Sequence, residues 1–450
     1  MYKLQSRHLG KYDVAVCGGG VAGVGAAAAA ARNGAKVILI ESTGALGGTA
    51  TSGLMGNILD GENKGGLIKE WYDFLNEYEL TIAHRGNRFD ENGKPVPGRL
   101  VDHEASKYFF EKVCAESGVK VLFNSLVSAV DIENEHINKI LISSLCGNYE
   151  ISADVYIDAT GFGSLSDLAG LKWDIGNPPN PASMSLILGG MPADYDGADS
   201  VAEKDEYANM LKENGIFVSA EQTSAKRMPG AATWIMGFNF EYDVMPDNIE
   251  RFSEAVMDGR KEAFEVIQAH RKIKGYEKLH TQATASYFGL REGRRVYGEY
   301  RLTDDDIIEG KRFHDGICLV TAGVDVHKLH NNDTTEVSRG VKSKPYHIPY
   351  RSLVPLGCDN MLLAGRCISG DFYPFASYRM IGNMTTVGEA AGYAASVCSK
   401  KKIKPSELDG SIVAEFIHHA DTSYDIAGEG YAFSCFFISR GGMPYFFLKT

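Results

Sequence analysis

A glycine-rich turn at residues 18–23, with the sequence Gly-Gly-Gly-Val-Ala-Gly, constrains this chain more than any other feature. It follows residues 12–17, which are short, apolar and β-branched, as is typical of a buried strand. Residues 24–33 have the alanine-rich composition of a helix, and Gly34 is a helix-stop signal. Residues 36–41 return to an apolar strand pattern. This order predicts a β-turn-α-β unit, one half of a Rossmann-type sheet.

The Gly-x-Gly-x-x-Gly spacing gives each glycine a mechanical role. Gly18 permits the tight turn, Gly20 lets a pyrophosphate approach the backbone, and Gly23 lets the helix pack against the strand. The helix N-terminus offers unpaired N–H groups and a partial positive charge to phosphates. Glu41 lies about 20 residues further on, where an acid binds ribose hydroxyls and disfavours a 2′-phosphate. The pattern predicts a dinucleotide site; the alternative is a glycine-rich turn in an α/β protein that binds no nucleotide.

Later segments extend this pattern. Asp158-Ala159-Thr160-Gly161 ends a second apolar strand, and Leu363-Ala364-Gly365-Arg366 marks a third site. Together with four other segments, these make the chain resemble the FAD-dependent oxidoreductase family of the glutathione-reductase-like flavoprotein class. The four segments are residues 46–51 (LGGTAT), 291–300 (REGRRVYGEY), 346–353 (YHIPYRSL) and 360–395. The resemblance runs from about residue 13 to about residue 409, and it implies FAD as the cofactor.

The resemblance also implies where the flavin nucleotide contacts the chain. Residues 47–49 would run along the flavin, residues 159–161 near the adenine ribose, and residues 365–366 near the ribityl chain. Residues 379–385 would wrap the isoalloxazine edge just before a helix at residues 388–398, whose N-terminus stabilises negative charge on reduced flavin. No His adjoins residues 47–49, so non-covalent FAD is expected. The expected cofactor-binding residues are Gly18, Gly20, Val21, Ala22, Gly23, Glu41, Ser42, Gly47, Gly48, Thr49, Val127, Ala159, Thr160, Gly161, Gly365, Arg366, Gly382, Asn383 and Met384.

The expected fold class is α/β: a Rossmann-like FAD-binding domain with a three-layer parallel sheet, interleaved with a mixed α+β substrate domain. The FAD-binding domain is predicted at residues 1–174 and 346–402, with a polar excursion at about residues 80–100. The substrate domain is predicted at residues 175–345, and residues 403–450 form a C-terminal extension. Further predicted elements are helices at 69–79, 104–117 and 249–272, strands at 119–123, 154–158 and 360–363, and a hairpin at 126–132 and 138–143.

Composition and charge narrow the function classes. The formal net charge of −12 and the lack of a basic stripe argue against a nucleic-acid binder. Eight cysteines without CxxC spacing argue against a metal cluster or a redox-active disulfide, and free thiols favour a cytoplasmic location. Residues 1–8 lack an apolar signal-peptide core, and residues 14–31 are too glycine-rich for a membrane anchor. The aromatic tail beyond about Gly428 is expected to cover a core edge or a partner.

His327, in the sequence Val-Asp-Val-His at residues 324–327, is the preferred acid–base residue. It follows an apolar strand, and imidazole titrates near neutral pH, which suits removal of an alcohol proton. The alternative is a structural histidine bonded to the backbone. His330 and His347 are weaker rivals. No histidines and acids have metal-ligand spacing, so no metal site is expected.

Arginines supply the other catalytic candidates. Arg291, Arg294 and Arg295 surround Gly293, and one of them would clamp an anionic or polyhydroxylated substrate. The alternative is that they pair with nearby acids such as Glu292, Glu299 or residues 304–306. The expected catalytic residues are His327, Arg294, Arg379 and Tyr350. Arg379 is included because it comes directly before the flavin-edge segment, and Tyr350 because it lies in an apolar strand that could face the flavin.

Hydride transfer between flavin N5 and a small polar substrate, with a carbohydrate alcohol as one candidate, is the expected activity. No second Gly-x-Gly-x-x-Gly indicates a domain for NAD(P)H, so electrons are expected to leave through oxygen, a diffusible acceptor or a partner protein. One alternative is reduction of an activated C=C bond with an arginine as proton donor. Another is a flavin-binding electron-relay or assembly protein. The sequence leaves the electron acceptor and a homo-oligomeric state open.

Overall fold

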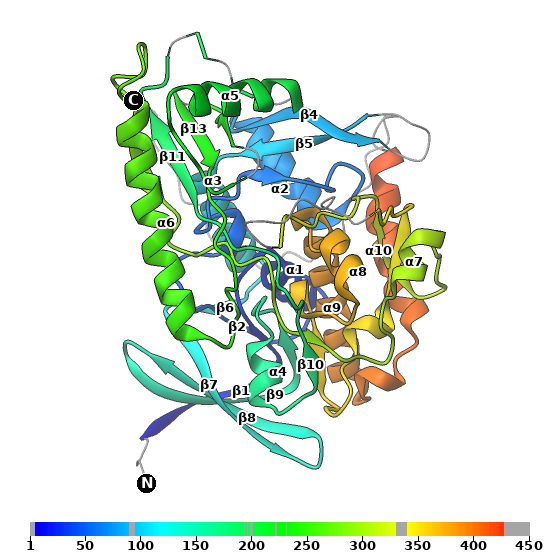
Figure 1. Ribbon diagram of the computed structural model, residues 1–450. Helices are drawn as coiled ribbons and strands as arrows, with labels where there is room; N and C mark the ends of the chain where they lie inside the picture. Colours follow the sequence, from blue (N-terminus) through cyan, green and yellow to red (C-terminus); the bar gives the residue numbers. More distant parts are fainter. Residues whose placement is uncertain are drawn as a thin grey trace, which may run out of the picture.

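The computed structural model describes residues 5–426, apart from residues 90–94, 193, 196, 199–200, 221–222, 231 and 330–339. It shows a mixed α/β molecule in which a parallel-rich sheet with its helices adjoins a second, antiparallel sheet (Figure 1). The expected class, a Rossmann-like domain plus an additional domain, is confirmed. His330 and the tail beyond Gly428 lie outside the described residues.

The seven-stranded main sheet runs in the order β6-β2-β1-β9-β8-β7, with β18 paired to β9. Its strands are β1 (Ser6–Cys17), β2 (Val37–Ile40), β6 (Lys120–Leu122), β7 (Ser125–Glu133), β8 (His136–Ser144), β9 (Gly147–Asp158) and β18 (Met361–Leu363). Strand β1 pairs in parallel with β2 and β9, and β18 pairs in parallel with β9. Cys17, Ile40, Asp158 and Leu363 therefore end at one edge of the sheet.

The predicted strands and hairpin are present, but two strands are longer than predicted. β1 starts at Ser6 and β9 at Gly147, where the predictions start at residues 12 and 154. The first half of each strand is polar and largely exposed or half-buried, so hydrophobicity does not mark it. Pairing between the two strands, which continues to Ser6 opposite Asn148, extends them.

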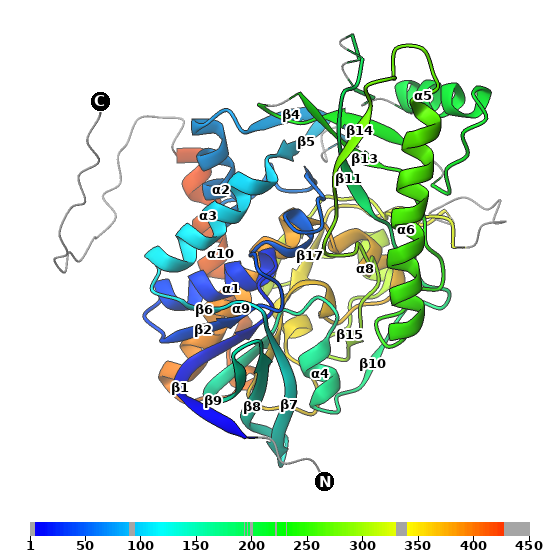
Figure 2. The same cartoon turned by 90° about the vertical axis from the view of Figure 1, so that its left-hand side faces the viewer.

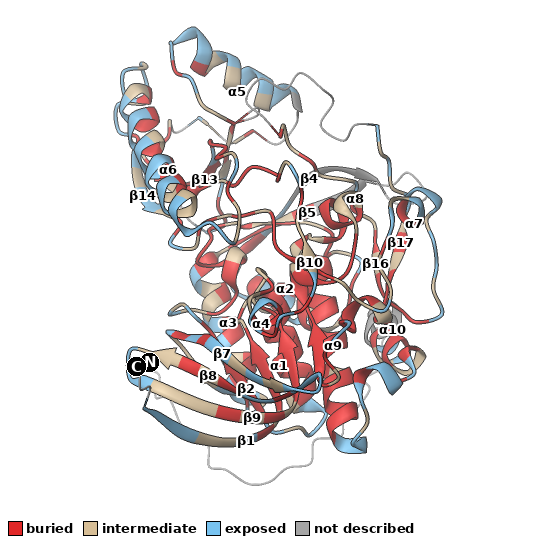
Figure 3. Ribbon diagram, turned by 60° about the horizontal axis from the view of Figure 1, so that its bottom comes forward, coloured by how far each residue is buried: buried red, intermediate tan, exposed pale blue. Residues whose placement is uncertain are grey.

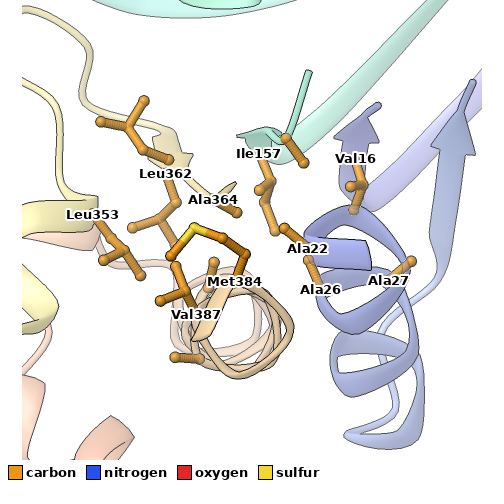
Figure 4. Close-up of a cluster of buried hydrophobic side chains, with 14 of the residues drawn as sticks. Val16, Ala22, Ala26, Ala27, Ile157, Leu353, Leu362, Ala364, Met384 and Val387 are labelled. Atoms are coloured by element: carbon orange, nitrogen blue, oxygen red, sulfur yellow. The ribbon is translucent and has the colours of Figure 1, made fainter. Parts of the chain in front are cut away.

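Two helices, α1 (Val21–Arg32) and α9 (Ile381–Lys401), lie side by side against the main sheet (Figure 2). A Cβ at Gly388 would lie 2.0 Å from the Ala22 carbonyl oxygen, and a Cβ at Gly392 would lie 2.0 Å from that of Ala26. Figure 4 shows the small side chains of Ala22 and Ala26 facing this contact, with larger side chains such as that of Val387 filling the space around it. Small residues thus let the two backbones touch.

Helix α9 starts at Ile381, seven residues before the predicted start, so the expected flavin-edge loop at residues 379–385 is wrong as a loop. Only Arg379 and Met380 link α9 to the preceding helix, α8 (Phe372–Tyr378), so residues 381–385 already belong to the start of α9. Glycine, asparagine and threonine have low helix propensity, which hid this turn. Tertiary contacts outweigh that propensity: the Gly382 N–H donates to Leu59.

The predicted polar excursion at about residues 80–100 contains two strands. β4 (Thr81–Phe89) pairs with β5 (Pro95–Val101), and β5 pairs with β3 (Asn57–Ile58), all antiparallel. Proline, glycine and charged residues give this stretch a low β-propensity. The pairing with β3 supplies long-range hydrogen bonds that local sequence does not reveal.

A second core forms around the antiparallel sheet β12-β13-β11-β14 and helix α6 (Ile249–His270). Its other elements are β11 (Ser185–Gly189), α5 (Val201–Glu213), β12 (Ser224–Arg227), β13 (Thr233–Gly237) and β14 (His280–Thr284). In Figure 3 the buried residues concentrate in the main sheet and α9, while α6 presents an exposed outer face. Apart from Leu54, the second core uses residues 182–290, whereas buried residues from Val296 to Ala322 join the first core. The domain boundaries themselves stay a prediction.

Helix α10 covers the first core within the predicted C-terminal extension, and its Phe416 stacks on Tyr393 of α9 at 4.0 Å between ring centroids. The remaining elements are α2 (Gly66–Glu77), α3 (His103–Glu116), α4 (Ser164–Leu168), β10 (Trp173–Asp174), β15 (Arg295–Val296), α7 (Asp304–Glu309), β16 (Gly316–Val320), β17 (Tyr346–Pro349) and α10 (Gly410–Ile426). Among the described helices, none is long and apolar enough to cross a membrane.

Alanine at Gly388 is expected to destabilise the fold. Its Cβ would lie 2.0 Å from the Ala22 carbonyl oxygen, and overpacking of this kind costs about 1–3 kcal/mol. Urea unfolding measures the change. Gly44→Ala is the matched control, because a Cβ there has no neighbour closer than 3.9 Å and is expected to leave the free energy of unfolding unchanged or slightly higher. Equal stability of the two variants would refute the close helix contact.

Candidate active site and cofactor cleft

A cavity of about 1100 Å³ opens where the parallel strands end. Ligands of open α/β sheets bind at this edge. One part of the wall comes from the glycine turn and the strand ends of the first domain. The other comes from the second sheet and from residues 287–291 and 325–328. The cavity therefore joins the predicted nucleotide site to the second domain.

The glycine turn has the geometry that its spacing predicts. Gly18 has a φ of 102°, and a Cβ there would lie 2.4 Å from the Ala159 carbonyl oxygen. A Cβ at Gly23 would lie 1.8 Å from the Gly18 carbonyl oxygen, so helix and turn touch. At Gly20 a Cβ meets nothing within 4 Å. Gly20 thus borders open cavity space at the start of α1.

The N-terminus of α1 is built to receive an anion. Gly20 is its N-cap, no side chain caps the helix, and its first turn holds no acid. The orphan N–H groups and the helix dipole there favour negative charge. Glu41 lies nearby at the end of β2, where its Oε2 accepts from Gly19 N at 2.6 Å and its Oε1 from Thr43 N at 2.7 Å. The carboxylate is thus held by the backbone beside the turn.

Most of the expected cofactor-binding residues line this cavity. They are Gly18, Gly20, Val21, Ala22, Glu41, Ser42, Gly47, Gly48, Thr49, Val127, Ala159, Thr160, Gly161, Gly365, Arg366 and Met384. Gly23, Gly382 and Asn383 lie behind the wall. Gly382 packs on the Asp60 backbone, and the Asn383 amide donates to Asp60 Oδ2 at 2.9 Å. Met380 and Ile381, from the segment expected at the flavin edge, also line the cavity. Sequence reasoning missed other cavity residues such as Tyr287, whose segment carries no distinctive pattern.

Arg366 connects the two parts of the wall. Its guanidinium lies 5.3 Å from the ring centroid of Phe162 and donates to the Leu290 carbonyl oxygen. A Cβ at Gly161 would lie 2.9 Å from Arg366 Nη2, so glycine makes room for the guanidinium. Arg366 therefore places a positive charge in the cavity wall, next to the backbone at Gly161.

At the far end of the cavity, Arg291, Asp325, His327 and Arg379 lie together beside Phe240. His327 Nε2 lies 3.7 Å from Asp325 Oδ1, and Arg379 Nη2 lies 3.4 Å from Asp325 Oδ2. The His327 ring packs on Phe240 at 5.0 Å between centroids, and the Arg291 guanidinium lies 5.2 Å from the same ring. Two of the expected catalytic residues, His327 and Arg379, are thus brought together.

This environment changes the proton affinity of both basic groups. Burial, aided by the positive charge of Arg291, lowers the pKa of His327 to about 3 despite the opposing effect of Asp325. Burial likewise lowers the pKa of Arg291 to about 10, and the like charge of Arg379 adds to this. At neutral pH the cluster therefore holds a neutral imidazole between charged guanidinium groups.

The other two expected catalytic residues lie elsewhere. Arg294 pairs with Asp167 at 3.2 Å, and its guanidinium lies 4.9 Å from the Trp173 ring centroid. The buried Tyr350 donates its hydroxyl to the Pro405 carbonyl oxygen at 2.9 Å, under helix α10. Both side chains have partners that hold them behind the cavity wall.

The neighbouring candidates are held by structural partners too. Arg295 pairs with Asp174 and Glu292, both at 3.2 Å, so the local pairing predicted as an alternative applies to it. The His347 ring lies near that of His418, with 6.2 Å between centroids, on strand β17. No group of His, Cys, Asp and Glu that could hold a metal ion occurs in the part of the chain that the structure describes.

A buried ion pair that sequence reasoning missed supports the cavity from behind. Asp60, 2% exposed, accepts from Lys64 Nζ at 3.2 Å, from Ala322 N at 2.9 Å and from the Asn383 amide. Burial acts to raise the pKa of Asp60, but the Lys64 ammonium and the donated hydrogen bonds outweigh it, and the pKa is lowered. Asp60 thereby ties the segment after β3 to the first turn of α9. An acid in a glycine-rich loop gives no local signal of such a role.

The fold and the cleft are those of a nucleotide-binding α/β protein: a bare helix N-terminus with an acid beside it is joined by one cavity to a cluster of protonatable groups. Comparison with known sequences is consistent with that class. The chain belongs to the FAD dependent oxidoreductase family, which matches residues 13–418. The protein is thus an FAD-dependent oxidoreductase.

Individual relatives are more distant. The digeranylgeranylglycerophospholipid reductase of Methanococcus vannielii is 28% identical over 165 residues, which make up 36% of this chain and 41% of that relative. A geranylgeranyl bacteriochlorophyll reductase-like structure from Thermoplasma acidophilum has 14% identity, 91% coverage of both chains and a TM-score of 0.49. A p-nitrophenol 4-monooxygenase structure from Pseudomonas putida has 12% identity, 93% coverage of this chain, 89% of its own and a TM-score of 0.46.

The residues of the cavity fit FAD. The open space at Gly20 beside the α1 N-terminus suits the pyrophosphate, and Glu41 suits a ribose. Gly47 and Gly48, with φ of 96° and 53°, present backbone without side chains to the same cavity. When bound, FAD supplies the two-electron hydride chemistry that amino-acid side chains lack.

Valine at Gly20 is expected to block the cofactor without unfolding the chain. The added side chain enters open space, so the melting temperature of the cofactor-free protein stays near wild type, while FAD affinity falls at least about tenfold. Gly23→Ala is the contrasting variant, because its Cβ meets the Gly18 carbonyl and is expected to lower the melting temperature. FAD fluorescence titration and thermal unfolding measure the two effects. Unchanged FAD affinity in Gly20→Val would refute this placement of the pyrophosphate.

Removing the Asp60 carboxylate is expected to cost about 3–5 kcal/mol in Asp60→Ala, because the Lys64 ammonium would stay buried without its partner. The matched control is Asp73→Asn, which breaks another Lys–Asp pair of the same i,i+4 spacing whose Asp73 side chain is 59% exposed. That change is expected to cost less than about 1 kcal/mol. Urea unfolding of the cofactor-free proteins measures both changes in the free energy of unfolding. Similar changes in the two variants would show that the buried Asp60–Lys64 pair is no more important for stability than the exposed one.

Proposed function

We propose that the protein transfers hydride between the flavin and a small polar substrate, oxidising a hydroxyl-bearing carbon. The observation that carries the proposal is the continuity of one cavity from the α1 N-terminus to the cluster of Arg291, Asp325, His327 and Arg379. A substrate at that cluster would share the cavity with the flavin. Membership of the glutathione-reductase-like flavoprotein class and non-covalent attachment of FAD are parts of the same proposal, the latter supported by the absence of His from residues 47–49.

In this proposal His327 takes the hydroxyl proton of the substrate. The C–H bond breaks with its electron pair leaving as hydride, the O–H bond gives its proton to the imidazole, and a C=O bond forms. The lowered pKa of His327 keeps the imidazole neutral, so it has a lone pair for the proton. Its backbone N–H donates to Asn180 Oδ1 at 3.2 Å, which fixes the position of the residue on its loop.

The second sheet supports a hydroxylated substrate. Ser183, Ser185, Ser224 and Asn239 from β11, β12 and neighbouring segments line the cavity. Their hydroxyl and amide groups donate and accept hydrogen bonds, as do substrate hydroxyls. We therefore propose a substrate that carries hydroxyl groups, with a carbohydrate-like alcohol as one candidate. The seven free cysteines of the described chain support a reducing, cytoplasmic setting.

A second candidate is reduction of an activated C=C bond. The observation that favours it is Arg291, whose pKa is lowered to about 10, so its guanidinium gives up a proton more readily than an ordinary arginine. The relative from Methanococcus vannielii is named a reductase. In this direction hydride would go to one carbon and the proton from Arg291 to the other.

Anaerobic spectroscopy of the holoenzyme separates the two candidates. Flavin absorbance at about 450 nm is expected to bleach when polyols, sugars or hydroxy acids are added, because substrate hydride reduces the flavin. His327→Gln is expected to slow this bleaching by about 10²–10⁴-fold, the usual contribution of a general base. His347→Gln is the control, since that ring lies away from the cavity, and it should leave the rate unchanged. If no alcohol bleaches the flavin and dithionite-reduced enzyme is reoxidised by activated alkenes, the reductase candidate replaces this one.

A further inference from the structure

The far end of the cavity carries more positive than negative charge. Arg291, Arg379 and Lys328 line it, against the single carboxylate of Asp325, whose side chain is 43% exposed. Helix α5 contributes Lys204 and Asp205 to the cavity lining, and their charges offset each other. Because burial strengthens electrostatic interactions, a pocket with this balance favours an anionic ligand.

Arg291 keeps donors for such a ligand. In the described chain its side chain makes one hydrogen bond, from Nη1 to the Pro181 carbonyl oxygen at 2.6 Å. A guanidinium has five N–H donors in a planar fork that matches a carboxylate. Phe240 lies against the guanidinium and holds it at the cavity wall.

Arg379 is oriented toward the same space. Its Nη2 donates to the Asp325 carbonyl oxygen at 2.6 Å, and its Nη1 donates to the Arg291 carbonyl oxygen at 3.5 Å. The two arginines are thereby linked through backbone, while Asp325 compensates only part of their charge. Their mutual repulsion contributes to the lowered pKa of Arg291.

We infer that this end of the cavity is a carboxylate-binding subsite, in which Arg291 and Arg379 receive the oxygens of a substrate carboxylate beside His327. The inference rests on the proposed function and names its substrate class, hydroxy acids rather than neutral alcohols. The carboxylate anchors the molecule, and the serines of the second sheet bind its hydroxyls.

Binding of the anion has a consequence for His327. Burial is the main cause of its lowered pKa, and the positive charges of Arg291 and Arg379 lower it further while Asp325 opposes them. An anion next to the arginines compensates their charge and stabilises the imidazolium, so it raises the pKa of His327. The substrate then makes its own proton acceptor more basic. When anion binding raises the pKa of His327, the complex takes up protons. An anion that stays ionised must therefore bind more tightly as the pH falls.

Benzoate tests the subsite without turnover, because its carboxylate-bearing carbon has no hydrogen to transfer. Titration of the oxidised holoenzyme with benzoate, followed by the flavin difference spectrum, is expected to saturate, while the neutral isostere benzamide binds at least about tenfold more weakly. Arg291→Gln and Arg379→Gln are expected to weaken benzoate by about tenfold or more, and Arg→Lys at each position to restore part of the affinity. Arg32→Gln, which removes an exposed arginine paired with Glu70, is the matched control and should bind like wild type.

Calorimetry of benzoate binding in buffers of different ionisation enthalpy measures the linked proton. Uptake is expected to grow between about pH 7.5 and about pH 5.5, where benzoate stays ionised, and to vanish in His327→Gln. Equal binding of benzamide, wild-type affinity in both arginine variants, or no proton uptake by the wild type overturns the subsite.

These readouts are independent of catalysis. Arginine-dependent benzoate binding in an enzyme whose flavin no hydroxy acid bleaches would retain the subsite and reject the proposed oxidation. Bleaching by neutral polyols alone, with no benzoate binding, would retain the oxidation and reject the subsite.

Discussion

Backbone-to-backbone contact at the glycine turn is the constraint on which the site depends. Gly18 lies so close to Ala159, and Gly23 so close to Gly18, that a single added carbon would overlap a carbonyl oxygen at either position. The contact brings the start of α1 to the edge where the parallel strands end. Because no side chain caps that helix, its N–H groups and dipole remain available to the cavity. Glycine allows backbone contact in the same way where α9 packs on α1, at Gly388 and Gly392.

The two ends of the cavity handle negative charge by different means. At the turn, backbone N–H groups and a helix dipole provide partial charges that suit the phosphates of FAD. At the far end, full positive charges from Arg291 and Arg379 lie next to a neutral His327. The pKa of a buried group beside full charges changes when a charged ligand binds, whereas a helix dipole does not titrate. The charge at the α1 N-terminus is therefore independent of the ligand, whereas a ligand at the arginines can change the protonation of His327.

Most of the residues that sequence patterns assigned to the cofactor line the cavity, but only some of the expected catalytic residues do. The glycine spacing and Glu41 lie within one βαβ unit, so local order alone specifies their geometry. His327 and Arg379 were also expected and do meet at the cavity, although their roles stay predictions. Arg294 and Tyr350 were expected beside them, yet Asp167 and Pro405, distant in the sequence, hold them elsewhere. Arg291 was one member of a cluster of three, and only the fold distinguishes it from Arg295, which pairs with Glu292.

The order of residues alone specifies the βαβ unit, the bare helix N-terminus and hence a nucleotide cofactor, because each depends on neighbours within about 30 residues. Tertiary structure decides the rest. The first turn of α9 forms because Asp60, more than 300 residues earlier, accepts a hydrogen bond from Asn383. β5 pairs with β3, which lies about 40 residues earlier in the chain, as well as with β4. The charge around His327 arises because residues 291, 325 and 379 come together at the cavity. Burial, ion pairing and pKa are properties of such assembled surroundings, and no local pattern encodes them.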